Sequence, residues 1–344
     1  MFVAKINLIE TVTRSTFTFV HRPITRSIGS LNMVNLLNSR EGVSSILNNV
    51  DTIITDCDGV IWLEKKSIPG ANSFFKKMRS MGKRIIFATN NNTKSRESLL
   101  TKLNSLEFEA TIDEIMVTTF AAPIALKRID FKGKVFCLGT PILRKEIESA
   151  GFTVIPPSSD TNENVEDAKL VKMDHIDYEL IKIDPQVGAV VIGMDYGLSN
   201  VKMIRACTYV SKVDSKCIIC TNTDFTFPGP GGIVIPGTGS YVELIEHVTG
   251  KKMFSVGKPT TFFFECIKQI HANIDPARTL MIGDRCDTDI AFGNNNKMKF
   301  TLLVGTGVNN LDDVKQFASN GDNHLIPSHF IQSLGDLNKY LTHD

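Results

Sequence analysis

The stretch "TDCDGVIW", residues 55–62, decides how the rest of the chain is interpreted. It directly follows the apolar run "TII" and places Asp56 and Asp58 two residues apart, before a glycine. At the carboxyl end of a parallel strand, such side chains project to the same side, where α/β sheets bind their ligands. Two carboxylates this close either raise one pKa strongly or require a cation. Because the stretch alone also fits a solvated turn, its meaning depends on the rest of the chain.

The surrounding sequence is typical of an α/β protein. Apolar runs over residues 52–55, 84–89 and 114–119 are rich in strand-forming residues, and helix-like segments such as "PGANSFFKKMRSMG" and "SRESLLTKLNSL" lie between them. This alternation predicts βαβ units and a parallel sheet. A second α/β unit begins near residue 131, and the first pattern returns after residue 251.

The first 42 residues differ from the rest. This segment is rich in Ser and Thr, and its charged residues are Lys5, Glu10, Arg14, Arg22, Arg26 and the pair Arg40 and Glu41 near its end. Two interpretations stay open, an organelle transit peptide or a disordered extension. Either way we expect residues 1–42 to lie outside the fold. The first predicts a mitochondrial protein and the second a cytoplasmic one.

Composition excludes several classes of protein. Lys+Arg 38 against Asp+Glu 37 gives a formal net charge of +1, so no overall field attracts nucleic acid or an anionic membrane. No apolar run reaches the roughly 18 residues of a membrane span. Seven scattered cysteines indicate reduced thiols of an intracellular protein. Cys217 and Cys220 have C-x-x-C spacing, but we interpret them as buried strand thiols because no second ligand pair follows.

Further polar residues follow other apolar runs. They are Thr89 in "FATNNNTKS", Lys258 in "VGKP", and Asp284 and Asp289 in "MIGDRCDTDI". Each has an ordinary explanation taken singly, as a turn, a surface lysine or a helix-entry acid. Together and in this order they predict a site that holds a phosphate and a divalent cation.

The ordered set "DCDGV", "ATNN", "VGKP" and "GDRCDTD" resembles the four motifs of the haloacid dehalogenase superfamily of phosphatases. It is most similar to the subgroup that acts on phosphoglycolate, pyridoxal phosphate and 4-nitrophenyl phosphate. The resemblance runs from about residue 45 to the C-terminus. It implies an α/β fold with a Rossmann-like parallel-sheet core, residues 43–130 and 252–344, an inserted α/β cap domain, residues 131–251, and a homodimer formed through the cap.

The resemblance also implies roles for the acids. Asp56 would be the nucleophile that forms an aspartyl-phosphate, and Asp58 the general acid and then the general base. Mg²⁺ would be held by Asp56, the Asp58 backbone carbonyl and Asp284, with Asp289 in support.

Phosphate and substrate contacts are implied as well. Thr89 and Lys258 would hold the phosphoryl oxygens. The residues expected in loops that face the substrate are Asn90, Asn91, Asn92, Asn222 and Asp224. For Asn222 and Asp224 an Asx turn at a strand end is an open alternative.

We therefore expect Mg²⁺-dependent hydrolysis of a small phosphorylated metabolite, 2-phosphoglycolate first, with pyridoxal 5′-phosphate or aryl phosphates as the alternative. No P-loop or G-x-G-x-x-G pattern is present, which disfavours nucleotide-dependent phosphorylation. A rival class is a binding or scaffold protein that has kept the fold; its mark would be loss of a motif acid or the lysine. Neither nucleic acid nor a membrane is expected as a partner. Redox regulation through Cys57 is left open.

Overall fold

A computed structural model gives the structure of residues 34–228 and 233–341. Most of the predicted transit peptide or extension, residues 1–33, lies outside these described residues. No helix among the described residues is both long enough and apolar enough to cross a membrane.

Seven strands of the described chain form the larger sheet, in the order β1-β16-β15-β14-β2-β5-β6, and every neighbouring pair is parallel. Their bounds are β1 Asn35–Leu36, β2 Thr52–Thr55, β5 Arg84–Thr89, β6 Ile115–Val117, β14 Thr279–Gly283, β15 Phe300–Val304 and β16 His329–Ile331. The runs predicted over residues 52–55 and 84–89 are β2 and β5, which confirms them as strands.

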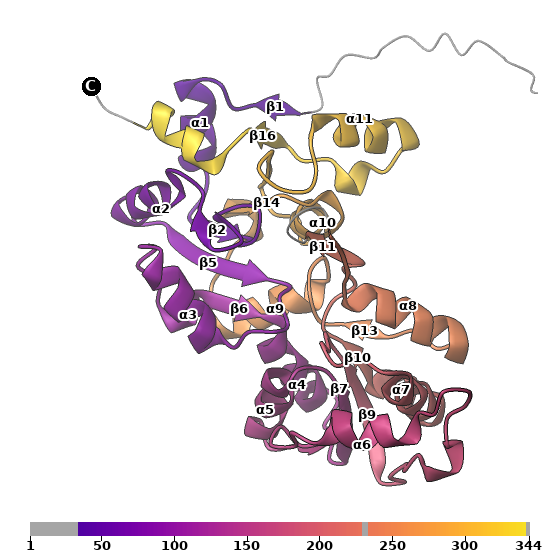
Figure 1. Cartoon of the computed structure of the whole chain (residues 1–344). Helices are drawn as coiled ribbons and strands as arrows, with labels where there is room; N and C mark the ends of the chain where they lie inside the picture. The colour runs from indigo at the N-terminus through magenta and orange to yellow at the C-terminus, as the bar shows by residue number, and fades with distance from the viewer. Residues whose placement is uncertain (1–33, 229–232, 342–344) are drawn as a thin grey trace, which may run out of the picture. The chain divides into compact units, whose positions relative to one another are not determined.

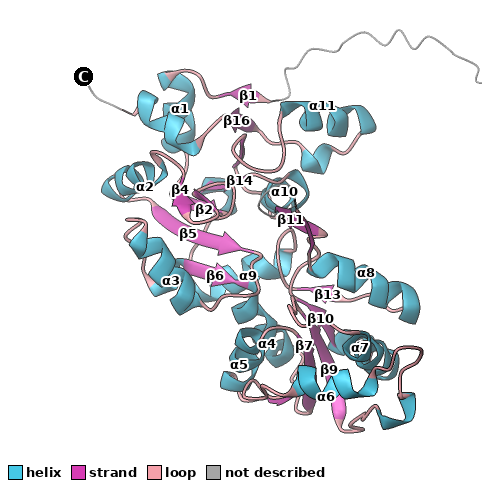
Figure 2. Ribbon diagram, viewed as in Figure 1, coloured by secondary structure: helices cyan, strands magenta, loops and turns pink. Residues whose placement is uncertain are grey.

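A second parallel sheet of five strands has the order β13-β10-β9-β7-β8 within the described residues. Its strands are β7 Lys134–Leu138, β8 Thr153–Ile155, β9 Val187–Ile192, β10 Ile218–Cys220 and β13 Phe254–Ser255. Two antiparallel hairpins accompany the sheets, β3 Trp62–Leu63 with β4 Lys66–Ser67, and β11 Thr226–Pro228 with β12 Val234–Pro236. The predicted fold class, a Rossmann-like parallel-sheet core with an additional α/β cap, is confirmed (Figure 2).

Helices connect the strands (Figure 1). Their bounds are α1 Arg40–Leu47, α2 Ala71–Ser80, α3 Arg96–Ser105, α4 Thr118–Arg128, α5 Pro141–Ser149, α6 Glu163–Leu170, α7 Asn200–Lys212, α8 Thr238–Thr249, α9 Thr261–Ile270, α10 Ala291–Asn295 and α11 Leu311–Asn320. A π-helical turn, Cys286–Ile290, leads into α10. N-terminal caps stabilise two of these helices. Ser95 accepts a hydrogen bond from a backbone amide in the first turn of α3, and Ser199 does the same in α7.

The larger sheet separates two apolar clusters because neighbouring side chains of a strand point to opposite faces. Ile53 packs with α1, α2 and α3 on one face, whereas Ile54 packs with α4 and α9 on the other. The second cluster continues into the second sheet through residues such as Val135 and Val191. The opposite face of the second sheet is covered by α7 and α8. Apolar packing therefore joins the two sheets through α4.

Each sheet has a point at which the strand order reverses. In the larger sheet, β2 is followed by β5 and β6 in one direction, and β14 by β15 and β16 in the other. In the second sheet the reversal lies between β7 and β9. Open α/β sheets bind ligands beyond the carboxyl ends of strands at such a point. The first reversal places the residues after β2 and β14 at a candidate site.

The structure differs from the sequence prediction at the N-terminal boundary. Residues 34–42, assigned above to an extension, contain β1, which pairs with β16, and the start of α1. Leu37 is buried in the apolar cluster of α1 to α3. Two-residue strands and a helix start carry little local signal, so only the packing reveals them. Similarly, β13 lies beyond residue 251 but belongs to the second sheet.

The adjacent residues Leu36 and Leu37 test this boundary. Leu37 is 6% exposed and Leu36 is 52% exposed. We expect Leu37→Ala to lower the free energy of unfolding by about 2–5 kcal/mol, because it leaves a cavity, and the matched Leu36→Ala to change it by less than about 0.5 kcal/mol. Urea unfolding followed by tryptophan fluorescence measures both. Equal effects of the two variants would contradict the packing described here.

Candidate active site

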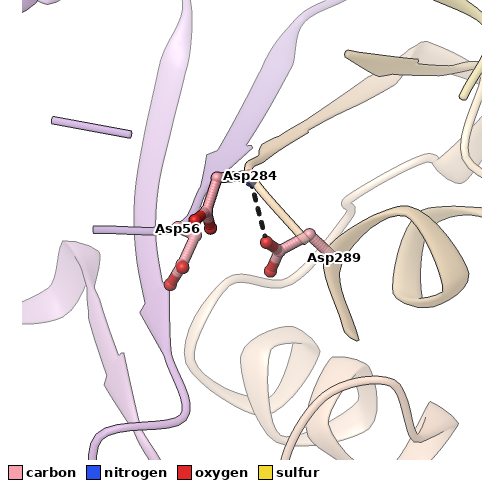
Figure 3. A group of neighbouring side chains, drawn as sticks. All are labelled: Asp56, Asp284 and Asp289. Atoms are coloured by element: carbon pink, nitrogen blue, oxygen red, sulfur yellow. Dashed lines mark hydrogen bonds between the residues drawn. The ribbon is translucent and has the colours of Figure 1, made fainter. Parts of the chain in front are cut away.

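The candidate site lies where β2 and β14 end side by side. The two strands pair with Thr55 opposite Ile282, and the Asp56 amide donates to the Ile282 carbonyl at 2.9 Å. Asp56 directly follows β2, and Asp284 directly follows β14. Figure 3 shows both carboxyl groups together with that of Asp289. Parallel pairing thus gathers acids that are far apart in the sequence.

Lys258 is the cation of this group. It is 1% exposed, and its Nζ lies 2.8 Å from Asp56 Oδ1 and 2.7 Å from Asp289 Oδ1. Burial alone would lower the pKa of Lys258, but the carboxylates of Asp289 and Asp56 together raise it above its usual range. Burial raises the pKa of Asp56 well above its ordinary value, and the charge of Lys258 opposes that rise. The site is therefore a buried, strongly charged cluster.

Asp289 holds its neighbours in place. Its Oδ1 accepts from Lys258 Nζ, and its Oδ2 accepts from the backbone amides of Asp284 and Arg285, both at 3.1 Å (Figure 3 draws the Asp284 bond). A Cβ atom on Gly283 would lie 2.0 Å from Asp289 Cβ, so this turn has space only for glycine. Both carboxylate oxygens of Asp289 are thus used within the protein.

Asp284 is different, because one of its oxygens is unpaired. Its Oδ2 accepts from the Val308 amide at 2.9 Å, whereas Oδ1 is buried and has no hydrogen-bond partner among the described residues. Burial, with a smaller contribution from Asp289, raises the pKa of Asp284 to about 7. Cβ atoms on Gly59 or Gly307 would lie 2.3 and 1.9 Å from Asp284 Oδ2. A buried, unpaired carboxylate oxygen is costly unless something binds it.

The acids fit a divalent cation. One oxygen from each of Asp56, Asp284 and Asp289 lies within 4.8 Å of the others. Hard cations such as Mg²⁺ take carboxylate oxygens as ligands. Because both oxygens of Asp289 already accept hydrogen bonds, Asp56 and Asp284 are the acids with capacity for a metal. The predicted contribution of the Asp58 carbonyl stays a prediction.

Asp58 lies in a different environment from Asp56. It is exposed, and its Oδ1 accepts from the indole nitrogen of Trp62 at 2.7 Å. The Nζ of Lys102 lies 3.7 Å from the centre of the Trp62 ring. Its carboxyl group is therefore held by one donor and is accessible at the edge of the buried cluster. The sequence analysis did not predict Trp62 as a partner of Asp58. The spacing of four residues between them was the available signal for this contact.

Thr89 is the last residue of β5, and Asn91 lies in the turn that follows it. Thr89 is buried, and its Oγ1 accepts from the Asn91 amide at 3.1 Å. Asn91 Oδ1 in turn accepts from the amide and the hydroxyl of Thr93, at 2.9 and 2.8 Å. These bonds fix the turn beside Asp56, since β5 neighbours β2. The predicted phosphate contact of Thr89 and substrate contact of Asn91 are untested and stay predictions.

Asn92 joins the core to the cap. Its Nδ2 donates to Thr238 Oγ1 at 3.0 Å, and its Oδ1 accepts from the Met194 amide at 2.8 Å. Met194 lies after β9, at the reversal point of the second sheet, and Thr238 begins α8. Asn92 is buried, and these contacts give it a structural role. Its predicted substrate contact stays a prediction.

Asn222 and Asp224 form the Asx turn that was the open alternative. The Asp224 amide donates to Asn222 Oδ1 at 3.2 Å. The turn also brings both side chains against Asn90: Asn222 Nδ2 donates to the Asn90 carbonyl at 2.7 Å, and Asn90 Nδ2 lies 3.3 Å from each Asp224 oxygen. Burial raises the pKa of Asp224, and Arg285 opposes that rise. A substrate contact for Asn222 and Asp224 stays a prediction.

The cysteines are free thiols, and none belongs to a candidate metal site among the described residues. Cys217 and Cys220 are free and buried, as predicted for strand thiols. Cys57, between the two catalytic candidates, is free and fully buried, and burial, with the charge of Asp56, raises the pKa of its thiol well above the ordinary value. A buried protonated thiol is a poor nucleophile, which disfavours oxidation at Cys57 while the fold is intact.

Comparison with known families agrees with this geometry. The model of a haloacid dehalogenase-like hydrolase family matches residues 53–153, and a second, HAD-hydrolase-like model matches residues 255–337. The unmatched interval between them contains β9, β10 and the helices α6 to α8. The two matches therefore carry the acids and Lys258, and the interval falls in the predicted cap.

Individual proteins are similar over nearly the same length. The glycerol-3-phosphate phosphatase of Mus musculus is 33% identical, over 87% of this chain and 93% of its own, and human chronophin is 32% identical, over 86% and 95%. Among solved structures, the p-nitrophenyl phosphatase from Archaeoglobus fulgidus has a TM-score of 0.68 at 29% identity, covering 85% of this chain and 99% of that one. With the strand-end acids and the buried lysine in the places described, these similarities identify the chain as a phosphatase of the haloacid dehalogenase-like hydrolase family.

Proposed function

We propose that this phosphatase hydrolyses small phosphomonoesters with Mg²⁺, through an aspartyl-phosphate on Asp56. One observation carries the proposal: Asp56, at the reversal point of the larger sheet, contacts the buried cation Lys258, and one of its oxygens lies within 4.8 Å of an oxygen of Asp284. Asp284 itself has a buried oxygen without a hydrogen-bond partner among the described residues. A phosphoryl group has anionic oxygens that need cations, and its phosphorus needs a nucleophile. Both are available within this cluster.

In the proposed reaction, a carboxylate oxygen of Asp56 attacks phosphorus, and the bond from phosphorus to the alkoxide oxygen of the substrate breaks. Asp58 gives its proton to the leaving alkoxide. Asp58 then takes a proton from a water molecule that attacks the aspartyl-phosphate, which releases inorganic phosphate and restores Asp56. Lys258 and Thr89 hold the phosphoryl oxygens throughout. Asp56, Asp284 and the Asp58 carbonyl would hold Mg²⁺, which would supply further positive charge for the phosphoryl group.

The substrate is proposed to be a small aliphatic phosphomonoester. Within this class we put forward 2-phosphoglycolate, as expected from the motifs, and glycerol 3-phosphate, because relatives with that name are 33% identical over most of both chains. Pyridoxal 5′-phosphate and 4-nitrophenyl phosphate are the alternative, supported by the similarity to a p-nitrophenyl phosphatase. A scaffold that has lost activity is disfavoured, because every motif acid and Lys258 are present. Of these residues, Asp56, Asp284, Asp289 and Lys258 are gathered at one place.

A panel of these four phosphomonoesters, assayed for phosphate release with Mg²⁺, tests the substrate proposal. We expect one aliphatic ester to be preferred over the aromatic ones by at least about tenfold in kcat/KM, because a pocket discriminates by the groups it pairs with beyond the phosphate. A clear preference for an aromatic ester would contradict the aliphatic assignment and leave the phosphatase chemistry in place.

Replacing Asp56 by Asn tests the nucleophile. We expect kcat to fall by at least about 10³-fold, because the amide cannot form the acyl-phosphate, while the fold is retained. Asp51→Asn is the matched control, since Asp51 lies at the opposite end of β2, exposed and paired with Arg278. Detection of ³²P on the wild-type chain and its absence from the variant would identify the intermediate; full activity of Asp56→Asn would remove the nucleophile assignment.

Asp284 tests the metal site without an activity assay. Its raised pKa means that ionised Asp284 destabilises the metal-free fold as pH rises from the ordinary value through about 7. At pH 8, Asp284→Asn should therefore raise the metal-free Tm by about 1–2 °C, equivalent to ~1 kcal/mol, and do so less at pH 5.

The same variant should also lose the rise in Tm that Mg²⁺ gives to the wild-type protein, because a ligand that binds only the folded state stabilises it. Asp287→Asn, on the exposed side of the same turn, should keep that rise. A Mg²⁺-dependent rise that persists in Asp284→Asn would exclude Asp284 as a ligand.

A further inference from the structure

Asn90 lies at the centre of the hydrogen bonds that join Lys258 to the cap. It follows Thr89 at the end of β5 and is 7% exposed. Its side chain and carbonyl contact Lys258, Asp224 and Asn222, and also Thr118 at the start of α4. No other role in the proposed reaction accounts for this set of contacts.

The side-chain carboxamide of Asn90 forms two hydrogen bonds with the backbone of Lys258. The Lys258 amide donates to Asn90 Oδ1 at 2.8 Å, and Asn90 Nδ2 donates to the Lys258 carbonyl at 3.1 Å. A carboxamide offers both an acceptor and donors, so it pairs with both main-chain groups of one residue. A Cβ atom on Gly257 would lie 2.6 Å from Asn90 Oδ1, so glycine at 257 is what permits the close approach.

The remaining capacity of Asn90 is used toward the cap. Its Nδ2 also lies 3.3 Å from both carboxylate oxygens of Asp224, and its carbonyl accepts from Asn222 Nδ2 at 2.7 Å and Thr118 Oγ1 at 3.1 Å. An amide nitrogen has two hydrogens, and both have partners here. Both hydrogens of the side-chain amide are therefore used within the protein, and the substrate contact expected for Asn90 from the sequence stays a prediction.

Lys258 needs such support. Its backbone lies just beyond β13 of the second sheet, whereas its Nζ contacts Asp56 and Asp289 at the larger sheet. A lysine side chain has four rotatable bonds, so the place of its Nζ depends on where the main chain is held. The only described side chain that binds both the Lys258 amide and its carbonyl is that of Asn90.

We infer that Asn90 is a positioning residue: its amide holds Lys258 where the ammonium meets Asp56 and the phosphoryl group, and ties that position to the cap segment 222–224. The inference rests on the proposed function, because it assigns Lys258 a role in the reaction. Asn90 therefore acts through Lys258, because its side-chain amide is used in hydrogen bonds within the protein.

A double-mutant cycle tests the inference, with single-turnover rates measured for wild type, Asn90→Ala, Lys258→Met and the double variant. We expect Asn90→Ala to lower the rate by about 10–100-fold, as for a misplaced catalytic group. In the Lys258→Met background, the same change should have almost no further effect, because there is no ammonium left to position. Circular dichroism and Tm for each variant check the fold.

Asn92→Ala is the matched comparison. Asn92 is a buried asparagine two residues away that also bonds the cap, but through Thr238 and Met194 rather than Lys258. The factor by which Asn92→Ala lowers the single-turnover rate should be the same in the wild-type and Lys258→Met backgrounds. If the Asn90→Ala loss were also unchanged in the Lys258→Met background, or if Asn90→Ala had wild-type activity, the inference would be wrong.

The connection to the cap is tested by exchanging partners. Asn90→Asp keeps the acceptor for the Lys258 amide but sets a second carboxylate against Asp224, so we expect it to lower the rate by at least about tenfold. Adding Asp224→Asn restores a donor and acceptor between the two positions and should recover several-fold. No recovery would exclude the connection through Asp224.

The proposed function fails in a distinguishable way. If Asp56→Asn and Lys258→Met both had wild-type rates, the site itself would be misassigned before any result at Asn90 was considered. If both abolished turnover and the cycle showed no coupling, the function would stand and the positioning role would be wrong.

Discussion

The ammonium of Lys258 between the carboxylates of Asp56 and Asp289 is the contact on which the site depends. All three groups are buried, and an isolated charge in such a place would cost several kcal/mol. Asp284 adds a further carboxyl with an unpaired oxygen, so the cluster contains three acids and one lysine. This excess of negative charge does not favour folding. It makes the cluster a place where a cation is stabilised, which is consistent with a metal-assisted reaction on an anionic phosphoryl group.

Strand order explains how such a cluster forms from distant segments. Asp56 and Asp284 meet because β2 and β14 are adjacent and parallel, and Asp289 reaches them because a π-helical turn follows β14 at once. Gly59, Gly283 and Gly307 allow the backbone to come close to Asp284 and Asp289, where a Cβ atom would overlap a carboxyl group. The acids are therefore held mainly by backbone geometry rather than by long flexible contacts.

Local sequence patterns were sufficient to predict much of the fold and many residues of the site. The strands β2 and β5 and helices such as α7 follow from apolar periodicity and capping, and the motif order indicated which residues gather. What the sequence did not reveal depends on tertiary contacts. Helix α4 contains Pro123, which weakens its local preference, and it forms because Ala121, Ala125 and Leu126 are buried between the two sheets.

The partner of a side chain was the hardest feature to predict. The sequence marks Asn90 and Asp58 as polar residues of a motif, and a motif alone suggests contact with substrate. The structure shows Asn90 bound to the main chain of Lys258, and Asp58 bound to the indole of Trp62. Asn90 and Lys258 are far apart in the sequence, so their pairing is set by the packing of whole elements, which no local pattern encodes. Asp58 and Trp62 are only four residues apart, so their pairing is local.

The same contacts bear on how the cap and the core share their work. Apolar packing through α4 and α9 joins the two sheets over a broad area, whereas the contacts near the acids are few, polar and specific: Asn90 to Asp224, and Asn92 to Met194 and Thr238. Changes in the loops that follow β9 and β10 can therefore alter what lies beyond the phosphate while the apolar packing is unchanged. Because Asn90 also binds Lys258, however, a change at Asp224 is expected to affect catalysis as well as recognition. We therefore expect changes in the loop after β9 to alter substrate specificity alone. Changes in the loop after β10 should alter specificity and catalysis together.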